Sequence, residues 1–164
     1  MSDTPPHLGH QDPEGRPRMI DVGDNPATVR VAEAEGRLLL SPGTLDALRA
    51  GVTPKGDPLM VAQLAGIQAA KQTPALIPLC HPIRLTGIDV HLELEDEPPA
   101  IRATAAIRAE DRTGAEMEAL TAVAVALLTA YDMLKGVDRG LRIEGIRLLR
   151  KSGGRTGDWE AASP

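Results

Sequence analysis

The sequence predicts an α+β fold in which two main helices lie on one face of a four-stranded antiparallel sheet, with a short extra helix beside them. Apolar and polar residues alternate in four segments, as they do in half-buried strands. Apolar segments that begin with helix-capping residues lie between these strands. The order is β-α-α-β-β-α-β. Without the short helix, it is the split β-α-β order of ferredoxin-like folds.

The first strand is predicted over Thr28–Leu40, interrupted or bent around Glu33–Gly36. Ser41-Pro42 follows with an N-cap and a first-turn proline, which predicts a short helix that ends at Gly51. This short helix is the extra element that has no counterpart in the split β-α-β order.

The second helix begins with the same kind of signal, Asp57-Pro58. The Ala-rich segment that follows, Leu59–Lys71, is apolar on most faces, which predicts a largely buried helix. Pro74 and Pro78 are expected to stop it, because proline disrupts the helical hydrogen-bond ladder.

The clearest strand is Gly87–Glu95, where apolar residues alternate with charged and polar ones. Asp96–Pro99 supplies a turn, and Ile101–Ile107 is the returning strand of a hairpin. The last strand is predicted over Leu141–Arg150, with its period disturbed at Gly145.

The last helix is predicted from a capping box, Thr113–Glu116, to about Lys135, with Gly136 closing it. On this helix, Asp132 and Lys135 are three residues apart and therefore neighbours on one face. The apolar turns before them imply burial. A half-buried acid–lysine pair suits proton transfer, because each member shifts the pKa of the other. The alternative is an ordinary surface ion pair.

Two glutamates, Glu116 and Glu118, lie at the start of the same helix. At ~1.5 Å per residue, Glu118 is about 21 Å from Asp132 along the axis, too far for a paired-carboxylate site. We therefore expect these glutamates to contact another part of a substrate or to belong to another subunit's site. Both also have structural alternatives, Glu116 as the capping-box residue and Glu118 through the helix dipole.

The chain of 164 residues predicts one catalytic domain, residues 19–160, after a disordered tail, residues 1–18, that is polar and rich in Pro, His and Gly. The net charge of −5 and the presence of only one Trp, one Tyr and no Phe argue against nucleic-acid binding. The single cysteine fits a reducing, cytoplasmic compartment. The most apolar run, Ala119–Tyr131, is too short to span a membrane. An aliphatic core that buries little area per side chain favours self-association.

Lysine is rare in this chain, which has fourteen arginines but only Lys55, Lys71, Lys135 and Lys151. A desolvated lysine can exchange protons and is a compact partner for phosphate, whereas arginine stays protonated. The placement of the four suggests a polyanion site with proton-transfer chemistry. Lys151 begins a Gly-rich segment, Lys151–Gly157, whose backbone N–H groups could approach an anion closely. Chance is the alternative explanation for so few lysines.

One histidine, His81, lies between Pro78 and Pro82, which hold the segment extended and fix the direction of the imidazole. Such a histidine can donate to phosphate or move a proton near neutral pH. A loop histidine bonded to the backbone is the alternative. Metal binding is not expected, because the other histidines lie in the tail or on a strand and Cys80 has no CxxC partner.

Several strings together resemble the cyclic pyranopterin monophosphate synthase family of molybdenum cofactor biosynthesis, over nearly everything from Met19 to Trp159. In chain order, they are Lys55-Gly56-Asp57, Leu76–Pro82, Thr113–Leu120, Tyr131-Asp132-Met133 with Lys135, and Lys151–Gly157.

The resemblance implies a lyase without metal or organic cofactor. It converts a cyclised dihydro-GTP, 3',8-cyclo-7,8-dihydro-GTP, to cyclic pyranopterin monophosphate and releases pyrophosphate. It also implies a homohexamer, a trimer of dimers, with active sites at subunit interfaces. Carried over by motif, the central acid–base pair is Asp132 and Lys135. Further catalytic residues are Lys55, His81, Glu116, Arg30 and Lys151, and substrate contacts are Leu79, Cys80, His81, Met117 and Glu118.

The chain departs from the family pattern at Gln72, Leu134, Gly43 and Arg155-Thr156, none of which removes a proposed chemical group. Two other functions remain open from the residues. A non-catalytic nucleotide-binding sensor would explain a cationic pocket but not the pairing of Asp132 with Lys135. A zinc-dependent cyclohydrolase is disfavoured by the scarcity of His and Cys.

Overall fold

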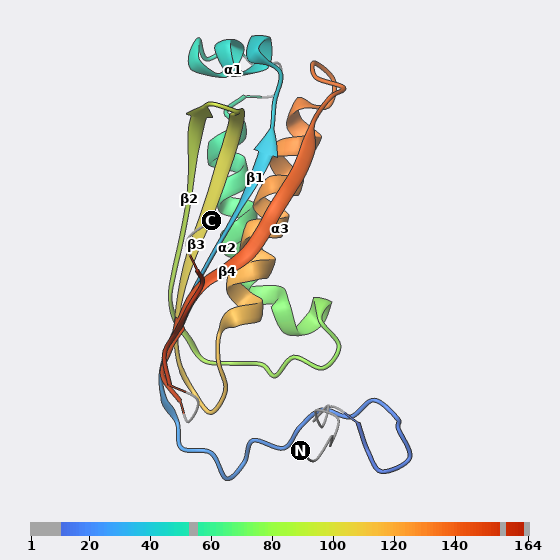
Figure 1. The fold of residues 1–164 in the computed structure, drawn as a ribbon, viewed down its shortest axis with the longest axis vertical. Coiled ribbons are helices and arrows are strands. Elements are labelled where there is room, and N and C mark those ends of the chain that lie inside the picture. The colour runs from blue at the N-terminus through green and yellow to red at the C-terminus, as the bar shows by residue number, and fades with distance from the viewer. Residues whose placement is uncertain (1–10, 53–55, 155–156, 163–164) are drawn as a thin grey trace.

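The computed structural model describes residues 11–52, 56–154 and 157–162 (Figure 1). Within them, the elements are β1 (Thr28–Leu39), α1 (Pro42–Arg49), α2 (Pro58–Leu76), β2 (Leu85–Asp96), β3 (Pro99–Asp111), α3 (Glu116–Leu134), β4 (Arg142–Ser152) and β5 (Trp159–Glu160). The sheet is antiparallel throughout, in the order β2-β3-β1-β4-β5. Helices α2 and α3 cover one of its faces (Figure 1). The predicted α+β, ferredoxin-like fold is confirmed, with β5 as an added fifth strand that is too short to show an alternating pattern.

The predicted starts of the first two helices, at Ser41-Pro42 and Asp57-Pro58, are confirmed. The Ser41 hydroxyl accepts from the Thr44 N–H at 3.4 Å, and the Asp57 carboxylate accepts from the Leu59 N–H at 2.9 Å. The prediction that Pro74 stops α2 is wrong, because the helix continues to Leu76. Proline removes only its own N–H from the ladder, and the next turn closes with a bond of 2.9 Å from the Ile77 N–H to the Thr73 carbonyl.

The first strand is not interrupted, because β1 pairs with β3 without a register shift, from Thr28 opposite Asp111 to Leu39 opposite Ala100. The predicted irregularity around Glu33–Gly36 is found on the other edge of the strand, where the pairing with β4 shifts between Glu33 and Ala34 and again between Glu35 and Arg37. The extra residues of these shifts belong to β4, which has Gly145 at φ +64°. The predicted disturbance at Gly145 is therefore confirmed. In β1, the small residues Ala34 and Gly36 face the helices, so the absence of large apolar residues marks close packing and not a break.

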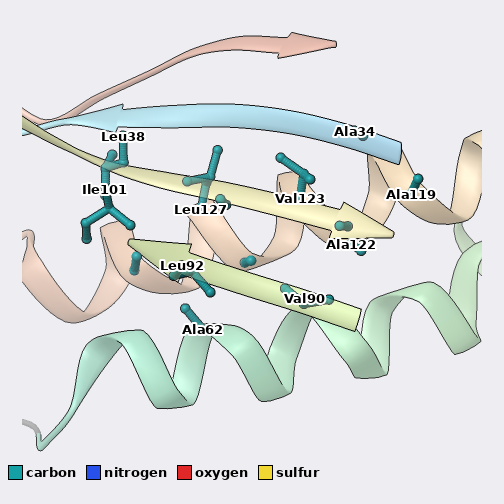
Figure 2. Packing of buried hydrophobic residues seen from close by; sticks show 14 of the residues in the cluster. Ala34, Leu38, Ala62, Val90, Leu92, Ile101, Ala119, Ala122, Val123 and Leu127 are labelled. Atoms are coloured by element: carbon teal, nitrogen blue, oxygen red, sulfur yellow. The ribbon is translucent and has the colours of Figure 1, made fainter. Parts of the chain in front are cut away.

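The core lies between the sheet and the two long helices and is aliphatic, as the lack of phenylalanine requires (Figure 2). Leu38, Ile101, Val90, Val123 and Leu127 are almost completely buried in it. Alanines fill many of the other core positions on both helices and on β1 and β3, and they let the helices lie close to each other and to the sheet. This packing fixes α3 along β1, β3 and β4, and so places both of its ends.

At Gly66 of α2 the two long helices lie close together, because a Cβ added there would lie 3.0 Å from the Ala122 carbonyl oxygen of α3. We expect Gly66→Leu to destabilise the protein by about 1–3 kcal/mol through overpacking. Gly43→Ala is the matched control, since a Cβ at that helical position meets nothing within 4 Å. It should be neutral or slightly stabilising. Urea unfolding at one protein concentration measures both, and equal midpoints would contradict the role of Gly66.

The tail is described only in part, since residues 1–10 lie outside the described residues. The predicted disorder of that stretch stays a prediction. Gln11 forms an isolated bridge with Pro17, and the Arg16 guanidinium contacts the Asp12 carboxylate at 2.6 Å. The most apolar helix, α3, is longer than its apolar run suggested, and by length and composition it could cross a membrane. Half of it is buried in the fold, as in the core helix of a globular domain.

Candidate active site

A cavity of about 400 Å³ lies where β1 begins and β4 ends. Its lining residues come from these two strands, from residues 112–116, from His81 and from the segment before β1. Four predicted site residues line it together: Arg30, His81, Glu116 and Lys151. They come from four distant parts of the sequence, so the fold alone brings them together.

Glu116 forms an ion pair with Lys151 in this cavity, with the Lys151 Nζ 2.9 Å from the Glu116 Oε1. The predicted capping box is wrong, because the N-cap of α3 is Ala115 and no side chain caps the helix. Glu116 is the first helical residue, so its side chain is available to the cavity instead of to the N-cap backbone. Lys151 belongs to β4, which runs through Ser152, and the Gly-rich loop begins after it.

The Arg30 side chain lines the cavity and is largely buried. Its guanidinium donates to the backbone carbonyls of Asp111 and Arg112, each at 3.3 Å. Within the described part of the chain, it makes no ion pair with a carboxylate. A Cβ at Gly154 (φ +84°) would lie 1.7 Å from the Arg30 Nη1, so glycine is needed there. A buried guanidinium bonded only to carbonyls retains its full positive charge for a bound anion.

His81 lines the same cavity and is bonded to the backbone, with its Nε2 2.7 Å from the Ile20 carbonyl oxygen. The predicted alternative, a loop histidine bonded to the backbone, is thus observed. His81 nevertheless also lines the cavity. Among the described residues, no group of three His, Cys, Asp or Glu side chains could hold a metal ion.

Four predicted substrate contacts do not line this cavity: Leu79, Cys80, Met117 and Glu118. Glu118 is 1% exposed, and its Oε2 is a buried atom with no hydrogen-bond partner. Burial is the main cause of the raised pKa of its carboxyl. The half-buried Cys80 thiol donates to the Glu118 Oε1 at 3.8 Å, so it links the loop that carries His81 to the start of α3.

Cys80 is expected to be unusually slow to alkylate. Burial, then the neighbouring Glu118 carboxylate, raises the pKa of the Cys80 thiol to about 11. At about pH 8, an ordinary cysteine of pKa about 8.5 has roughly 200 times more of the reactive thiolate. The iodoacetamide rate, followed by mass spectrometry, should rise about tenfold per pH unit between about pH 8 and 10. Protein unfolded in urea is the control and should react as a free thiol. A rate that levels off near pH 9 in the folded protein would contradict this.

Asp132 and Lys135 lie at the opposite end of α3 from this cavity (Figure 1). They form an ion pair of 2.6 Å, but their side chains are 60% and 58% exposed. The predicted half-burial is therefore wrong for the single chain. The pair lies on the same face of the helix as the exposed Leu128, whereas the buried Leu127 faces the core. The hydrogen bond to Asp132 raises the pKa of Lys135. Glu116 and Asp132 are sixteen residues apart, or about 24 Å along the helix.

Sequence reasoning missed two contributors to the cavity, Arg112 and the segment from Ile20 to Asn25. Arg112 lies next to the recognised string that begins at Thr113, but no periodic pattern distinguishes it from a surface arginine. The Ile20–Asn25 segment contains no helix or strand and so has no periodicity to detect. Two predicted elements, Lys55 and the pair Arg155-Thr156, lie outside the described residues.

Comparisons with known proteins show the family of this chain. Residues 19–154 match the sequence model of the MoaC family. A Nocardioides protein named cyclic pyranopterin monophosphate synthase is 51% identical over 160 residues, which cover 97% of this chain and 98% of that protein. Proteins of the same name from a Methylobacterium species and from Thermomicrobium roseum are 55% and 53% identical over 154 and 152 residues. These cover 94% and 93% of this chain, and 96% and 92% of the two relatives.

Proposed function

This chain belongs to the MoaC family, a family of enzymes of molybdenum cofactor biosynthesis, and on that premise we propose the reaction that it catalyses. The substrate is 3',8-cyclo-7,8-dihydro-GTP, and the products are cyclic pyranopterin monophosphate and pyrophosphate. The catalytic domain is residues 19–160, and the reaction takes place in the cytoplasm without a metal or organic cofactor. The observation that carries the proposal is the meeting of Arg30, His81, Glu116 and Lys151 in one cavity.

The charges of the cavity suit a triphosphate. Arg30 and Lys151 supply two cations, Arg112 a third, and Lys55 is proposed as a fourth. During ring closure, a sugar hydroxyl oxygen bonds to the α-phosphorus, its proton leaves to a base, and the bond from that phosphorus to pyrophosphate breaks. Lysine and arginine would stabilise the charge that develops on the departing pyrophosphate.

Proton transfers require an acid and a base close to the pterin ring atoms. His81 lines the cavity, which supports one of these roles for it. Glu116 would hold the Lys151 ammonium group in position before the substrate binds. A phosphate of the bound substrate would then replace Glu116 as the partner of Lys151. Leu79, Cys80, Met117 and Glu118 are proposed as contacts of the substrate in the assembled enzyme.

About 24 Å of helix separates Asp132 from Glu116 in the cavity of its own chain, which supports a contribution of Asp132 and Lys135 to the site of a second subunit. We propose that a homohexamer, a trimer of dimers, brings them to the cavity of a neighbour. Exposed apolar residues on the helical face support such contacts: Leu128 of α3 is 57% exposed, and Met60 and Leu64 of α2 are also exposed. Burial under a second subunit would desolvate the acid–lysine pair and make it a better proton-transfer device.

The test is an assay of the purified protein with the cyclised dihydro-GTP. Pyrophosphate release and pterin formation should both be seen with the wild type. His81→Gln and Lys151→Met should each lower turnover by about 10²-fold or more. Arg49→Gln on the exposed surface of α1 is the charge-loss control and should keep wild-type turnover. Tight binding of the substrate without turnover would reject the proposed reaction and favour a nucleotide sensor.

A further inference from the structure

The segment from Ile20 to Asn25, here called the strap, forms one wall of the cavity and is tied to the fold at both ends. At one end, the Ile20 carbonyl contacts the His81 Nε2 at 2.7 Å. At the other, the Asn25 Nδ2 donates to the Arg112 carbonyl at 3.3 Å. The strap is thus an ordered part of the cavity although it contains no helix or strand.

The turn within the strap is closed by its own bonds. The Gly23 N–H donates to the Asp21 carboxylate at 2.8 Å, and the Asn25 N–H donates to the Val22 carbonyl at 3.0 Å. An aspartate that bonds the backbone two residues later is a recurrent way to fix a turn. The strap therefore holds the Ile20 carbonyl in a defined place.

The bond between the strap and His81 has only one possible direction. A carbonyl oxygen has lone pairs and no proton, so the imidazole Nε2 must be the donor. In the neutral ring, the proton is then on Nε2, and Nδ1 carries the free lone pair. No described atom of the protein forms a hydrogen bond with Nδ1.

We propose that the strap is a positioning element for catalysis. Through the Ile20 carbonyl, it holds His81 in the Nε2–H tautomer, so that Nδ1 is the atom that takes a proton from the substrate or returns it. The two prolines around His81 restrict the backbone, and the strap restricts the ring. The proton transfer to or from the substrate rests on the proposed function. The tautomer of His81 does not, because it is a property of the protein without substrate.

The positions of the four histidines make this measurable. His7 and His10 lie before the strap, so a truncation of residues 1–18 that also has His91→Gln leaves His81 as the only histidine. In protein with ¹⁵N-labelled histidine, solid-state NMR at about pH 8 should show a neutral ring with a protected Nε2–H. With ¹³C-carbonyl isoleucine, that Nε2 should show contact with an isoleucine carbonyl. A truncation of residues 1–22 removes Ile20, so this contact should disappear. In the longer protein, Ile20→Val keeps the carbonyl but removes its label. That variant should therefore lose the labelled contact and keep the protected N–H.

Turnover gives the second readout. Removal of residues 1–22 should lower kcat about tenfold or more relative to removal of residues 1–18, with Asp21→Ala in the full chain as a milder variant. In a His81→Gln background, the same truncation should cause no further loss, because the strap acts through that imidazole.

Two results would overturn the proposal. One is an Nδ1–H ring in protein with an intact strap. The other is an equal loss of turnover from strap removal with or without His81, which would indicate a merely structural role. If the wild-type protein made no pyranopterin, the proposed function would fail, while the NMR result would still decide the tautomer.

Discussion

Two inactive variants, Asp132→Asn and Lys151→Met, are expected to restore activity when they assemble together. Alone, each should lose about 10²–10⁴-fold in turnover, since one lacks a proton-transfer group and the other a cation for the phosphates. In a mixed dimer, one of the two sites combines the intact cavity of one subunit with the intact Asp132–Lys135 pair of the other. Equal mixing makes half of the dimers mixed, so about a quarter of wild-type turnover should return.

The control for this experiment mixes Lys151→Met with His81→Gln. Both substitutions affect the same cavity, so every site in a mixed dimer remains defective and no activity should return. Native mass spectrometry verifies that mixed assemblies form in both experiments. Mixed assemblies of the first pair that stay inactive would mean that Asp132 does not serve the cavity of a neighbouring subunit.

Loss of Glu35 is expected to have the largest effect on stability. This carboxylate lies in the middle of the sheet, on the face away from the helices, and its side chain is only 5% exposed. It accepts from Arg102 at 2.7 Å and from Arg147 at 2.8 Å, which joins β1 to both of its neighbours. Glu35→Ala should lower the free energy of unfolding by about 3 kcal/mol, because two partly buried guanidinium groups lose their shared carboxylate.

Glu93→Ala is the matched control. Glu93 also pairs with Arg102, at 3.0 Å, but its side chain is 46% exposed. Its loss should lower the free energy of unfolding by less than about 1 kcal/mol. Urea titrations of the two variants at pH 7 and one protein concentration compare the effects. Equal destabilisation would show that burial of the Glu35 carboxylate contributes nothing.

The Glu35 contribution should also depend on pH. Burial alone would raise the pKa of this carboxyl, but the hydrogen bonds from Arg102 and Arg147 outweigh burial and lower it from 4.5. A lowered pKa in the folded state means that the stabilisation is complete above the unfolded value and is lost as the pH falls through the folded value. The difference in unfolding free energy between wild type and Glu35→Gln should therefore shrink below about pH 4.5.

The elements that could be predicted from the sequence are those with a strong local signal. The alternation in Gly87–Glu95 and the cap at Asp57 each identify an element by themselves. The errors occur where tertiary packing outweighs the local signal. Thr113–Glu116 has the pattern of a capping box, yet Lys151 from a distant strand binds the glutamate. The segment Glu33–Gly36 suggested an interruption of β1, yet the strand continues and arginines of β4 pair with Glu33 and Glu35.

The candidate site divides in the same way. The family motifs predicted Arg30, His81, Glu116 and Lys151, and they share a cavity. Neither the strap nor Arg112 could be predicted, because an irregular segment has no periodicity and its tie to His81 spans sixty-one residues. The exposure of Asp132 and Lys135 also could not be predicted, because adjacent residues on a helix face different surroundings and the apolar turn before them is buried on its other side.

Strand β5 gives the protein an optical reporter of its own site. Trp159 is the only tryptophan in the chain, and it pairs across the sheet with Lys151. Its indole is about half exposed, so its emission responds to changes in local water and charge. Titration with pyrophosphate, which does not absorb in the tryptophan band, can therefore follow anion binding beside Lys151 in the unlabelled wild-type protein. The lack of other tryptophans means that the whole signal comes from this end of the sheet.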